Sequence, residues 1–187
     1  MNGKSAVSKG VELETHTPVF SPNLNLSFGY SYTDARLTQS FCLPVGNGTG
    51  APNGFIPCGI QGLNGERLPG TTQNSGSATL TYTQSLAQPR SIVYTLNADY
   101  KGSLLNSLGT IANNFTPVTL PGYALVNASI TESLNEHLRI GLFGSNLLDK
   151  RAVLGAPQRG VEFLGNLANV YSINRPREIS LHVSYDW

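Results

Sequence analysis

The last ten residues of the chain, 178–187, alternate polar and apolar side chains without a break and end on an aromatic residue. Because successive side chains of a β-strand point to opposite faces, a strand here would separate two different environments. One face is polar, and the other carries only apolar and aromatic residues, namely Ile179, Leu181, Val183, Tyr185 and Trp187. A strand at the edge of a soluble sheet shows the same pattern. The pattern in the rest of the chain must therefore decide whether this strand belongs to such a sheet.

The same period of two recurs six times before this segment. The sequence predicts further strands at residues 5–16, 24–36, 77–86, 91–101, 123–132 and 137–147. In residues 24–36, leucine and aromatic residues alternate with Asn, Ser, Gly and Thr. Lys9 is the one charged residue expected on an apolar face. The chain is therefore expected to be all-β, with about seven antiparallel strands.

The predicted connections alternate between short and long. Short turns are expected at residues 17–23, 87–90 and around Asn135, and long irregular segments at 38–76, 102–122 and 149–177. The alternation of side chains within a strand does not require the connections to alternate in length. The connection lengths are therefore independent information about the fold. Short turns at one rim and long loops at the other are typical of transmembrane β-barrels of bacterial outer membranes.

Composition agrees with this interpretation. Charged residues make up 12% of the chain, against roughly 25% in soluble globular domains. The sequence has no run of about 18 apolar residues that could form a spanning helix. The net charge of +1 gives no basic footprint for nucleic acid, and the first residues lack the apolar segment of a signal peptide. The apolar faces are expected to contact outer-membrane lipid, and the polar faces a wet or protein-filled lumen.

Four short motifs, in order, carry a resemblance to a known family. They are Gly-Val-Glu-Leu-Glu at 10–14, Tyr-Ser-Tyr-Thr-Asp-Ala at 30–35, Asn-Leu-Leu-Asp-Lys-Arg at 146–151 and Asn-Arg-Pro-Arg at 174–177. Together with the aromatic carboxy-terminus, they resemble the end of a TonB-dependent outer-membrane receptor. The family motif residues are Asn146, Leu147, Asp149, Arg175, Pro176 and Arg177.

The resemblance implies an active-transport receptor in the bacterial outer membrane. Such a receptor is a barrel of about 22 strands, filled by an amino-terminal plug. It takes up scarce ligands, such as iron–siderophore complexes, cobalamin or oligosaccharides, when the TonB complex pulls on the plug. The resemblance also implies that Ile179, Leu181, Val183, Tyr185 and Trp187 form the signal for the barrel-assembly machinery, with a simple interfacial anchor as the alternative role for Trp187.

Residues 1–187 are expected to be the carboxy-terminal portion of such a barrel. The family's signal peptide, its TonB-contacting segment, its plug and roughly the first two thirds of its barrel have no counterpart in the chain. A seven-stranded sheet would stay open, and its unpaired edges are costly in lipid. The missing strands and plug are therefore expected partners, and TonB would act only through the plug. The expected origin is a truncated gene, an incomplete sequence or an excised fragment.

Cys42 and Cys58 lie in the first long segment and are expected to form a disulfide in an exported protein. The alternative is two reduced thiols in a cytosolic product. The three histidines lack metal-ligand spacing, and no Ser, His and Asp arrangement indicates catalysis, so no enzyme activity and no cofactor are expected. The glycine-rich segment 46–50 is expected to be a ligand-contacting loop.

Two other functions fit part of the pattern. One is a small stand-alone or oligomeric outer-membrane barrel, similar to a porin or an adhesin. The other is a secreted β-sandwich that binds a ligand through its long loops. The sandwich predicts that Leu26, Leu96, Ile140 and Leu181 pack together in a protein core, whereas the receptor predicts that they face outwards.

Overall fold

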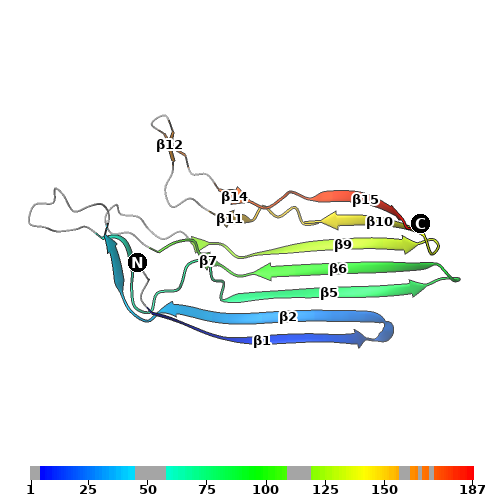
Figure 1. The fold of residues 1–187 in the computed structure, drawn as a ribbon, viewed down its shortest axis with the longest axis horizontal. Helices are drawn as coiled ribbons and strands as arrows, with labels where there is room; N and C mark the ends of the chain where they lie inside the picture. The colour runs from blue at the N-terminus through cyan, green and yellow to red at the C-terminus, as the bar shows by residue number, and fades with distance from the viewer. Residues whose placement is uncertain (1–4, 45–57, 109–118, 156–160, 164–165, 169–170) are drawn as a thin grey trace, which may run out of the picture.

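Most of the protein forms one open antiparallel sheet of seven strands in a computed structural model (Figure 1). The structure describes residues 5–44, 58–108, 119–155, 161–163, 166–168 and 171–187, and only the backbone of 42–44, 58–61, 161–163 and 166–168. The sheet order is β1-β2-β5-β6-β9-β10-β15. The bounds are β1 Ala6–Val19, β2 Ser21–Leu37, β5 Asn74–Ser85, β6 Ser91–Lys101, β9 Tyr123–Ser133, β10 Leu138–Ser145 and β15 Glu178–Tyr185. The seven predicted strands are thus confirmed, with β1 and β15 at the two edges.

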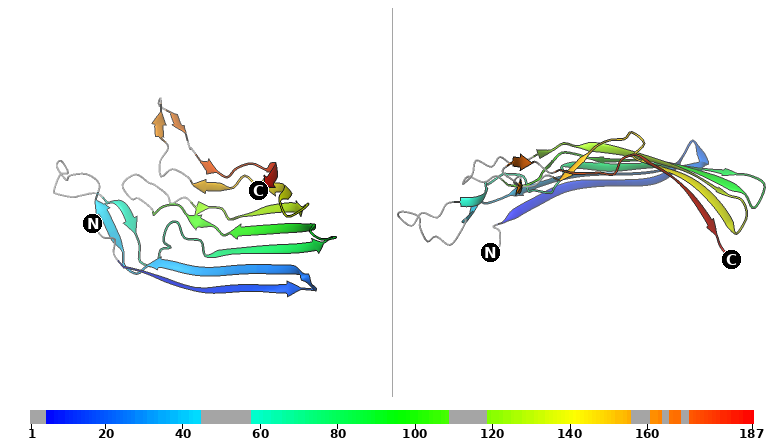
Figure 2. Two further views of the ribbon diagram at one scale, coloured as in Figure 1. Left: turned by 45° about the vertical axis from the view of Figure 1, so that its right-hand side comes forward. Right: turned by 90° about the horizontal axis from the view of Figure 1, so that it is seen from above.

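All short connections lie at one end of the sheet, here called the turn end, and all long ones at the other, the loop end (Figure 1). The loop end also contains short hairpin strands that the sequence analysis did not predict. They are β3 Phe41–Pro44 with β4 Cys58–Gly62, β7 Leu104–Leu105 with β8 Thr119–Leu120, β11 Val153–Gly155 with β14 Ser172–Ile173, and β12 Val161–Phe163 with β13 Asn166–Ala168. Figure 2 shows that the main sheet is a single curved layer.

The first turn is tighter than predicted. The two prolines suggested a connection over residues 17–23, but β1 continues to Val19 and β2 begins at Ser21. The regular ladder ends where Pro18 pairs with Asn25, the register shifts before Val19 pairs with Ser21, and Phe20 between these two has a positive φ of 62°. Pro18 is tolerated inside β1 because this strand has no further neighbour on its outer side in the sheet.

The register sorts the side chains into two faces. In one cross-strand row, Leu26 pairs with Leu80, Leu80 with Leu96, and Leu96 with Ala128. This row and every second row on either side of it form the apolar face. The apolar face carries Leu13, Leu26, Phe28, Leu80, Leu96, Ile130, Ile140, Leu142, Leu181 and Val183. The rows in between form the hydrophilic face, which carries Glu12, Glu14, His16, Ser27, Thr79, Thr95, Asn97, Asn127, Ser129 and His182.

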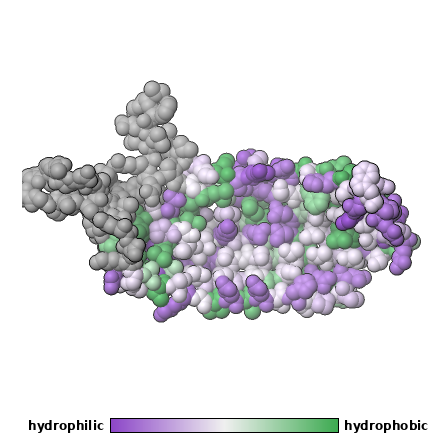
Figure 3. Space-filling view, viewed as in Figure 1, coloured by the Kyte–Doolittle hydropathy of each residue, from purple (hydrophilic) through white to green (hydrophobic). Residues whose placement is uncertain are grey.

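The apolar face is uncovered. Leu96 is 48% exposed, Ile140 36% and Leu181 68%, and Leu26 is half-exposed. Within the described part of the chain, the buried hydrophobic residues are Ala35, Leu37, Leu120 and Ala152, all near the loop end. The core that a β-sandwich requires is therefore not formed by these leucines. In Figure 3, the strands seen from one side are mostly purple and white, with green only in small separate areas, so that side is largely hydrophilic.

Charged side chains limit the apolar face at both ends. Lys9 lies opposite Asp34 at the loop end, as expected for a charge near a rim, and Arg36 contacts Asp34 at 2.8 Å. At the turn end, Glu132 pairs in register with Ile140 and forms an ion pair with Arg90. Lys9 is thus not the only charged residue on this face. Between these limits lies a continuous apolar band.

Candidate functional site

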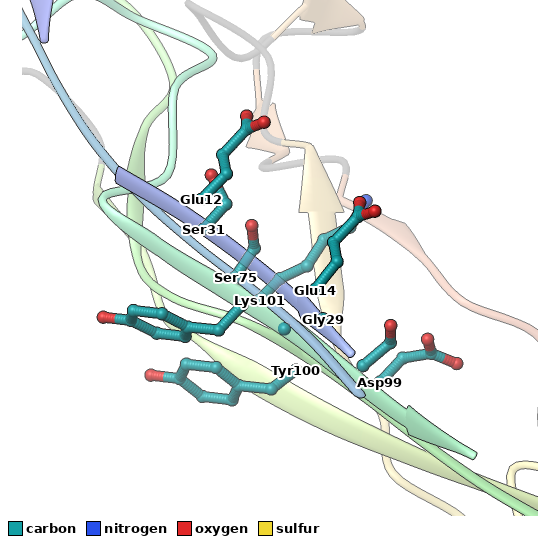
Figure 4. Close-up of a pocket in the computed structure, with 11 residues that line it drawn as sticks. Glu12, Glu14, Gly29, Ser31, Ser75, Asp99, Tyr100 and Lys101 are labelled. Carbon is teal, nitrogen blue, oxygen red and sulfur yellow. The ribbon is translucent and has the colours of Figure 1, made fainter. Parts of the chain in front are cut away.

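Charged side chains gather near the loop end of the hydrophilic face. Glu12 and Glu14 from β1 and Asp99 and Lys101 from β6 border an open hollow of about 300 Å³. Serines of β2 and β5 lie between them, because Glu12 pairs with Ser31, which is followed across the sheet by Ser75 and Lys101. Figure 4 shows these charged groups on one side of the sheet and the Tyr100 ring on the other. The hollow offers charges and hydroxyl groups to a solute or to another protein segment.

A chain of hydrogen-bonded side chains crosses the middle of the same face. Asn97 Nδ2 donates to Thr79 Oγ1 (3.1 Å), and Asn127 Nδ2 donates to Asn97 Oδ1 (3.0 Å). Asn127 Oδ1 then accepts from the Asn146 main-chain amide (3.0 Å), just beyond the end of β10. This amide ladder joins the centre of the sheet to the connection that follows β10.

That connection begins and ends with the two carboxy-terminal family motifs, and the structure brings them together. Asn146 is 5% exposed, and its Nδ2 donates to the carbonyls of Lys150 (3.1 Å) and Arg175 (3.0 Å). Its Oδ1 accepts from the Lys150 amide at 2.9 Å. Asn146 and Asp149 both have positive φ, 48° and 47°, a conformation that asparagine and aspartate adopt more readily than most residues.

Further contacts close the same junction, here called the loop stem and formed by residues 146–152 and 173–177. The Ala152 amide donates to Asn174 Oδ1 (2.7 Å), and the Arg177 amide donates to Asp149 Oδ1 (3.0 Å). Val153, the first residue of β11, pairs with Ile173, the last residue of β14, at the edge of the stem. Leu147 anchors the stem to β9 through its amide, which donates to the Val126 carbonyl. A methyl group on Gly144 would lie 2.6 Å from Leu147 Cδ2, so glycine leaves the space that this leucine occupies.

The electrostatics of the stem favour an ionised Asp149. The hydrogen bond from the Arg177 amide lowers the pKa of this carboxyl below its ordinary value. Desolvation acts in the opposite direction, and the positive charges of Arg151 and Arg177 add to the lowering. Arg175 contributes through the backbone, since its carbonyl accepts from both Asn146 and Asn174, and Pro176 follows it directly in the chain.

The carboxy-terminal strand keeps the two faces that the sequence predicts. Leu181 pairs with Leu142 and Val183 with Ile140 on the apolar face. Tyr185 Cα faces Leu138, and the Trp187 ring meets the Tyr185 ring edge-on at 5.8 Å between centroids. Ile179 begins the same apolar stripe opposite Gly144. No contact in the structure tests recognition of these five residues by another protein.

The predicted disulfide lies outside the described side chains. The backbones of β3 and β4 pair, with Cys42 opposite Gln61 and Cys58 opposite Pro44. Among the described residues, no group of three or more His, Cys, Asp or Glu side chains could hold a metal ion. The described part of the chain has no helix that is long and apolar enough to cross a membrane.

Three side chains with structural contacts on the sheet faces were missed from the sequence. Asn97 and Asn127 looked like ordinary polar positions of alternating strands, and only the register shows that they share a row. Glu132 ends an apolar alternation at the position where an apolar residue is expected. That departure from the pattern was the available signal.

The comparisons with known proteins agree with the geometry. A family model described as "TonB dependent receptor-like, beta-barrel" matches residues 2–147. No curated protein is significantly similar in sequence.

Solved structures with the same fold cover nearly all of the chain. One is the siderophore receptor PiuA from Acinetobacter baumannii, with 22% identity over 96% of this chain and 22% of that chain, at a TM-score of 0.64. Another is the ferric yersiniabactin uptake receptor FyuA from Yersinia pestis, with 15% identity over 97% and 24%, at a TM-score of 0.65. A third is the ferric-catecholate import receptor Fiu from Escherichia coli K12, with 20% identity over 97% and 28%, at a TM-score of 0.53.

The chain thus spans about a quarter of the length of these three receptors. The two-faced open sheet, the family model over residues 2–147 and the shared fold lead to the same assignment. The chain belongs to the family of TonB-dependent receptor-like β-barrels.

Proposed function

We propose that residues 1–187 form the carboxy-terminal portion of the barrel of an outer-membrane receptor that imports a scarce ligand with energy delivered by TonB. The observation that carries this proposal is the uncovered apolar face, with the hydrophilic face behind it. Members of the family are bacterial outer-membrane proteins. In this proposal, lipid covers the apolar face and the hydrophilic face lines the lumen.

The dimensions of the apolar face support contact with a bilayer. On β6, its side chains run from Ile92 to Tyr100, which is about 27 Å along a strand. A barrel strand tilted by about 40° would span about 21 Å of membrane with this stretch, close to the apolar band of about 25 Å in such barrels. Glu132 lies in register with Ile92 at one limit of this stretch, and Asp34 lies four residues beyond Tyr30, which is in register with Tyr100 at the other limit. Both charges would then lie at or outside the membrane boundaries.

The two edges support completion of the barrel by other strands. The outer sides of β1 and β15 have no neighbouring strand among the described residues. In hydrocarbon, each unpaired backbone group costs several kcal/mol. Preceding barrel strands would pair with both edges, and a plug would fill the lumen against the hydrophilic face. TonB would engage that plug rather than this part of the barrel.

The ligand class to test first is a ferric siderophore, because the printed descriptions of the similar structures name siderophore, ferric yersiniabactin and ferric-catecholate receptors. Cobalamin and oligosaccharides are the next classes. The test is uptake of radiolabelled ferric chelates by iron-starved cells that express the complete receptor. We expect uptake to require the receptor and TonB, and to stop when a proton uncoupler is added.

Uptake that continues without TonB and follows the ligand gradient would refute this function. It would favour the stand-alone or oligomeric pore instead. A receptor with residues 178–187 deleted serves as the negative control, because loss of β15 leaves the edge of β10 unpaired and should prevent assembly of the barrel.

We also propose a disulfide between Cys42 and Cys58. The pairing of β3 with β4 places the two cysteines on neighbouring strands, two residues apart in register, so the bridge requires a small shift of the backbone. Mass spectrometry of the alkylated receptor should find both thiols blocked to alkylation unless a reductant is added first. Full alkylation without reductant would refute the bridge.

A further inference from the structure

The apolar face contains a notch towards its turn end. The notch has a volume of about 210 Å³ and is bordered by side chains of β2, β5, β6 and β9. Leu80 and Leu96 border it in one row, and the next residue of that row is the small Ala128. In the adjacent row, the Tyr82 and Tyr94 rings stack with centroids 6.0 Å apart and planes at 27°. The notch exists because the row that carries leucines on β5 and β6 continues with the small Ala128 on β9 and Gly144 on β10.

A polar cap lies next to the notch on the side of the turns. Its row is Gln84, Ile92 and Glu132, which pair in register across β5, β6 and β9. The Tyr94 hydroxyl donates to Gln84 Oε1 at 3.2 Å. Arg90, from the β5–β6 turn, forms an ion pair with Glu132, and the two side chains are 50% and 31% exposed. An accessible cation and anion are thus held side by side, next to the tyrosines that border the apolar notch.

The cap fixes the depth of the notch in a bilayer. A basic side chain on the lipid side of a barrel costs about 2–4 kcal/mol at the midplane and almost nothing at the interface, and an acidic one costs less. The row with Glu132 is therefore placed at the headgroups, and the notch lies immediately inside the hydrocarbon. The two stacked tyrosines lie between them, where aromatic rings with a polar tip are favoured.

We propose that the notch and its cap bind one membrane phospholipid, with an acyl chain in the notch and a phosphoethanolamine headgroup on the Arg90–Glu132 pair. The proposal rests on the proposed function, because it requires the apolar face to contact a bilayer. Charge complementarity selects the headgroup. The Arg90 guanidinium can donate to a phosphate, and the Glu132 carboxylate can accept hydrogen bonds from a primary ammonium.

Other headgroups satisfy only part of this pair. A phosphocholine group carries the same charges, but its quaternary nitrogen has no hydrogen to donate to Glu132. A phosphoglycerol group has no positive charge, so it would bring a second negative charge close to Glu132. The site should therefore prefer phosphoethanolamine lipids over both.

The test uses the complete receptor with this chain as its carboxy-terminal portion, purified from nanodiscs with equal amounts of phosphoethanolamine and phosphocholine lipids of identical acyl chains. Native mass spectrometry counts the lipids that stay bound. We expect a phosphoethanolamine excess that falls roughly tenfold in Arg90→Gln and in Glu132→Gln, which corresponds to about 1.4 kcal/mol. Ala128→Leu fills the notch and should reduce the number of bound lipids of both types.

Two variants serve as matched controls. Arg139→Gln breaks the Arg139–Asp186 ion pair (2.9 Å), which lies at the same end of the sheet but on the hydrophilic face. Ala124→Leu enlarges another alanine of β9 on the apolar face that does not line the notch. Both should hold lipid as the unmodified receptor does.

Equal retention of the two lipids by the unmodified receptor would overturn the proposal, and so would an undiminished excess in Arg90→Gln and Glu132→Gln. Failure of the receptor to insert into nanodiscs would refute the proposed function as well. A receptor that inserts and imports its ligand, but shows no lipid preference, would overturn this inference alone.

Discussion

Replacing Asn146 tests whether the loop stem is held by one side chain. In Asn146→Ala, the stem loses the bonds from Nδ2 to the Lys150 and Arg175 carbonyls and the bond from the Lys150 amide to Oδ1. Each contributes about 1 kcal/mol net, so together they stabilise the stem by about 3 kcal/mol. The left-handed backbone at φ 48° adds a cost of roughly 1 kcal/mol for alanine, which glycine does not incur.

The two effects separate in a pair of variants. We expect Asn146→Gly to lower the free energy of stem opening by about 3 kcal/mol, and Asn146→Ala by about 4 kcal/mol. Hydrogen exchange of the complete receptor in micelles measures this opening, because the Lys150, Ala152 and Arg177 amides all donate within the stem. Their exchange should accelerate about 150-fold in the glycine variant.

Asn135→Ala is the control, because Asn135 Oδ1 also accepts two amides, but in the β9–β10 turn at the other end of the sheet. It should leave the exchange of the stem amides unchanged. Stem amides that exchange within about twofold of the unmodified rate in Asn146→Ala would refute the claim that this side chain closes the stem.

Three further predictions test the charge, the faces and the carboxy-terminus. The pKa of Asp149 lies below its unfolded value of about 3.9. The ionised carboxylate should therefore stabilise the stem above about pH 4, and this stabilisation should be lost as the pH falls through the folded pKa. Asp149→Asn should abolish this pH dependence in the exchange of the Arg177 amide. Leu96→Lys should destabilise the barrel in vesicles by about 2–4 kcal/mol, measured by denaturant unfolding, and Thr95→Lys on the other face by much less; equal effects would contradict the assignment of the faces. Deletion of Trp187 should reduce the folded receptor in outer membranes, seen as a loss of its heat-modifiable band, whereas unchanged abundance would favour the anchor role.

Side-chain alternation was enough to predict the seven strands, because a sheet with two solvents repeats every two residues along each strand. Boundaries were harder at the first turn. Pro18 and Pro22 suggested a loop, yet β1 continues past Pro18 to Val19 and β2 already begins at Ser21, with a shift of the register between them. A proline costs little where no neighbouring strand needs its amide, and the sequence does not show where neighbours end.

The parts of the site that depend on distant pairing could not be predicted. The Asn146 and Arg175 motifs were recognised separately, but their contact across 29 residues follows from the pairing of β10 with β15. The ladder from Thr79 to Asn127 likewise requires the register of three strands. Glu132 shows a third reason: its place on the apolar face was visible from parity, but its partner Arg90 lies in a turn.

The unequal length of the strands has a consequence for how the interior meets the outside. Gly144, one residue from the end of β10, is level through the register with Leu26 of β2. From there β2 continues to Leu37, about 36 Å farther along the strand. The sheeted rim therefore slopes down towards β10 and β15. On the low side, the described contacts that hold the connection are those of the stem and of the β11–β14 pair. In a completed barrel, the stiffness of these contacts would limit how far the connection swings over the lumen.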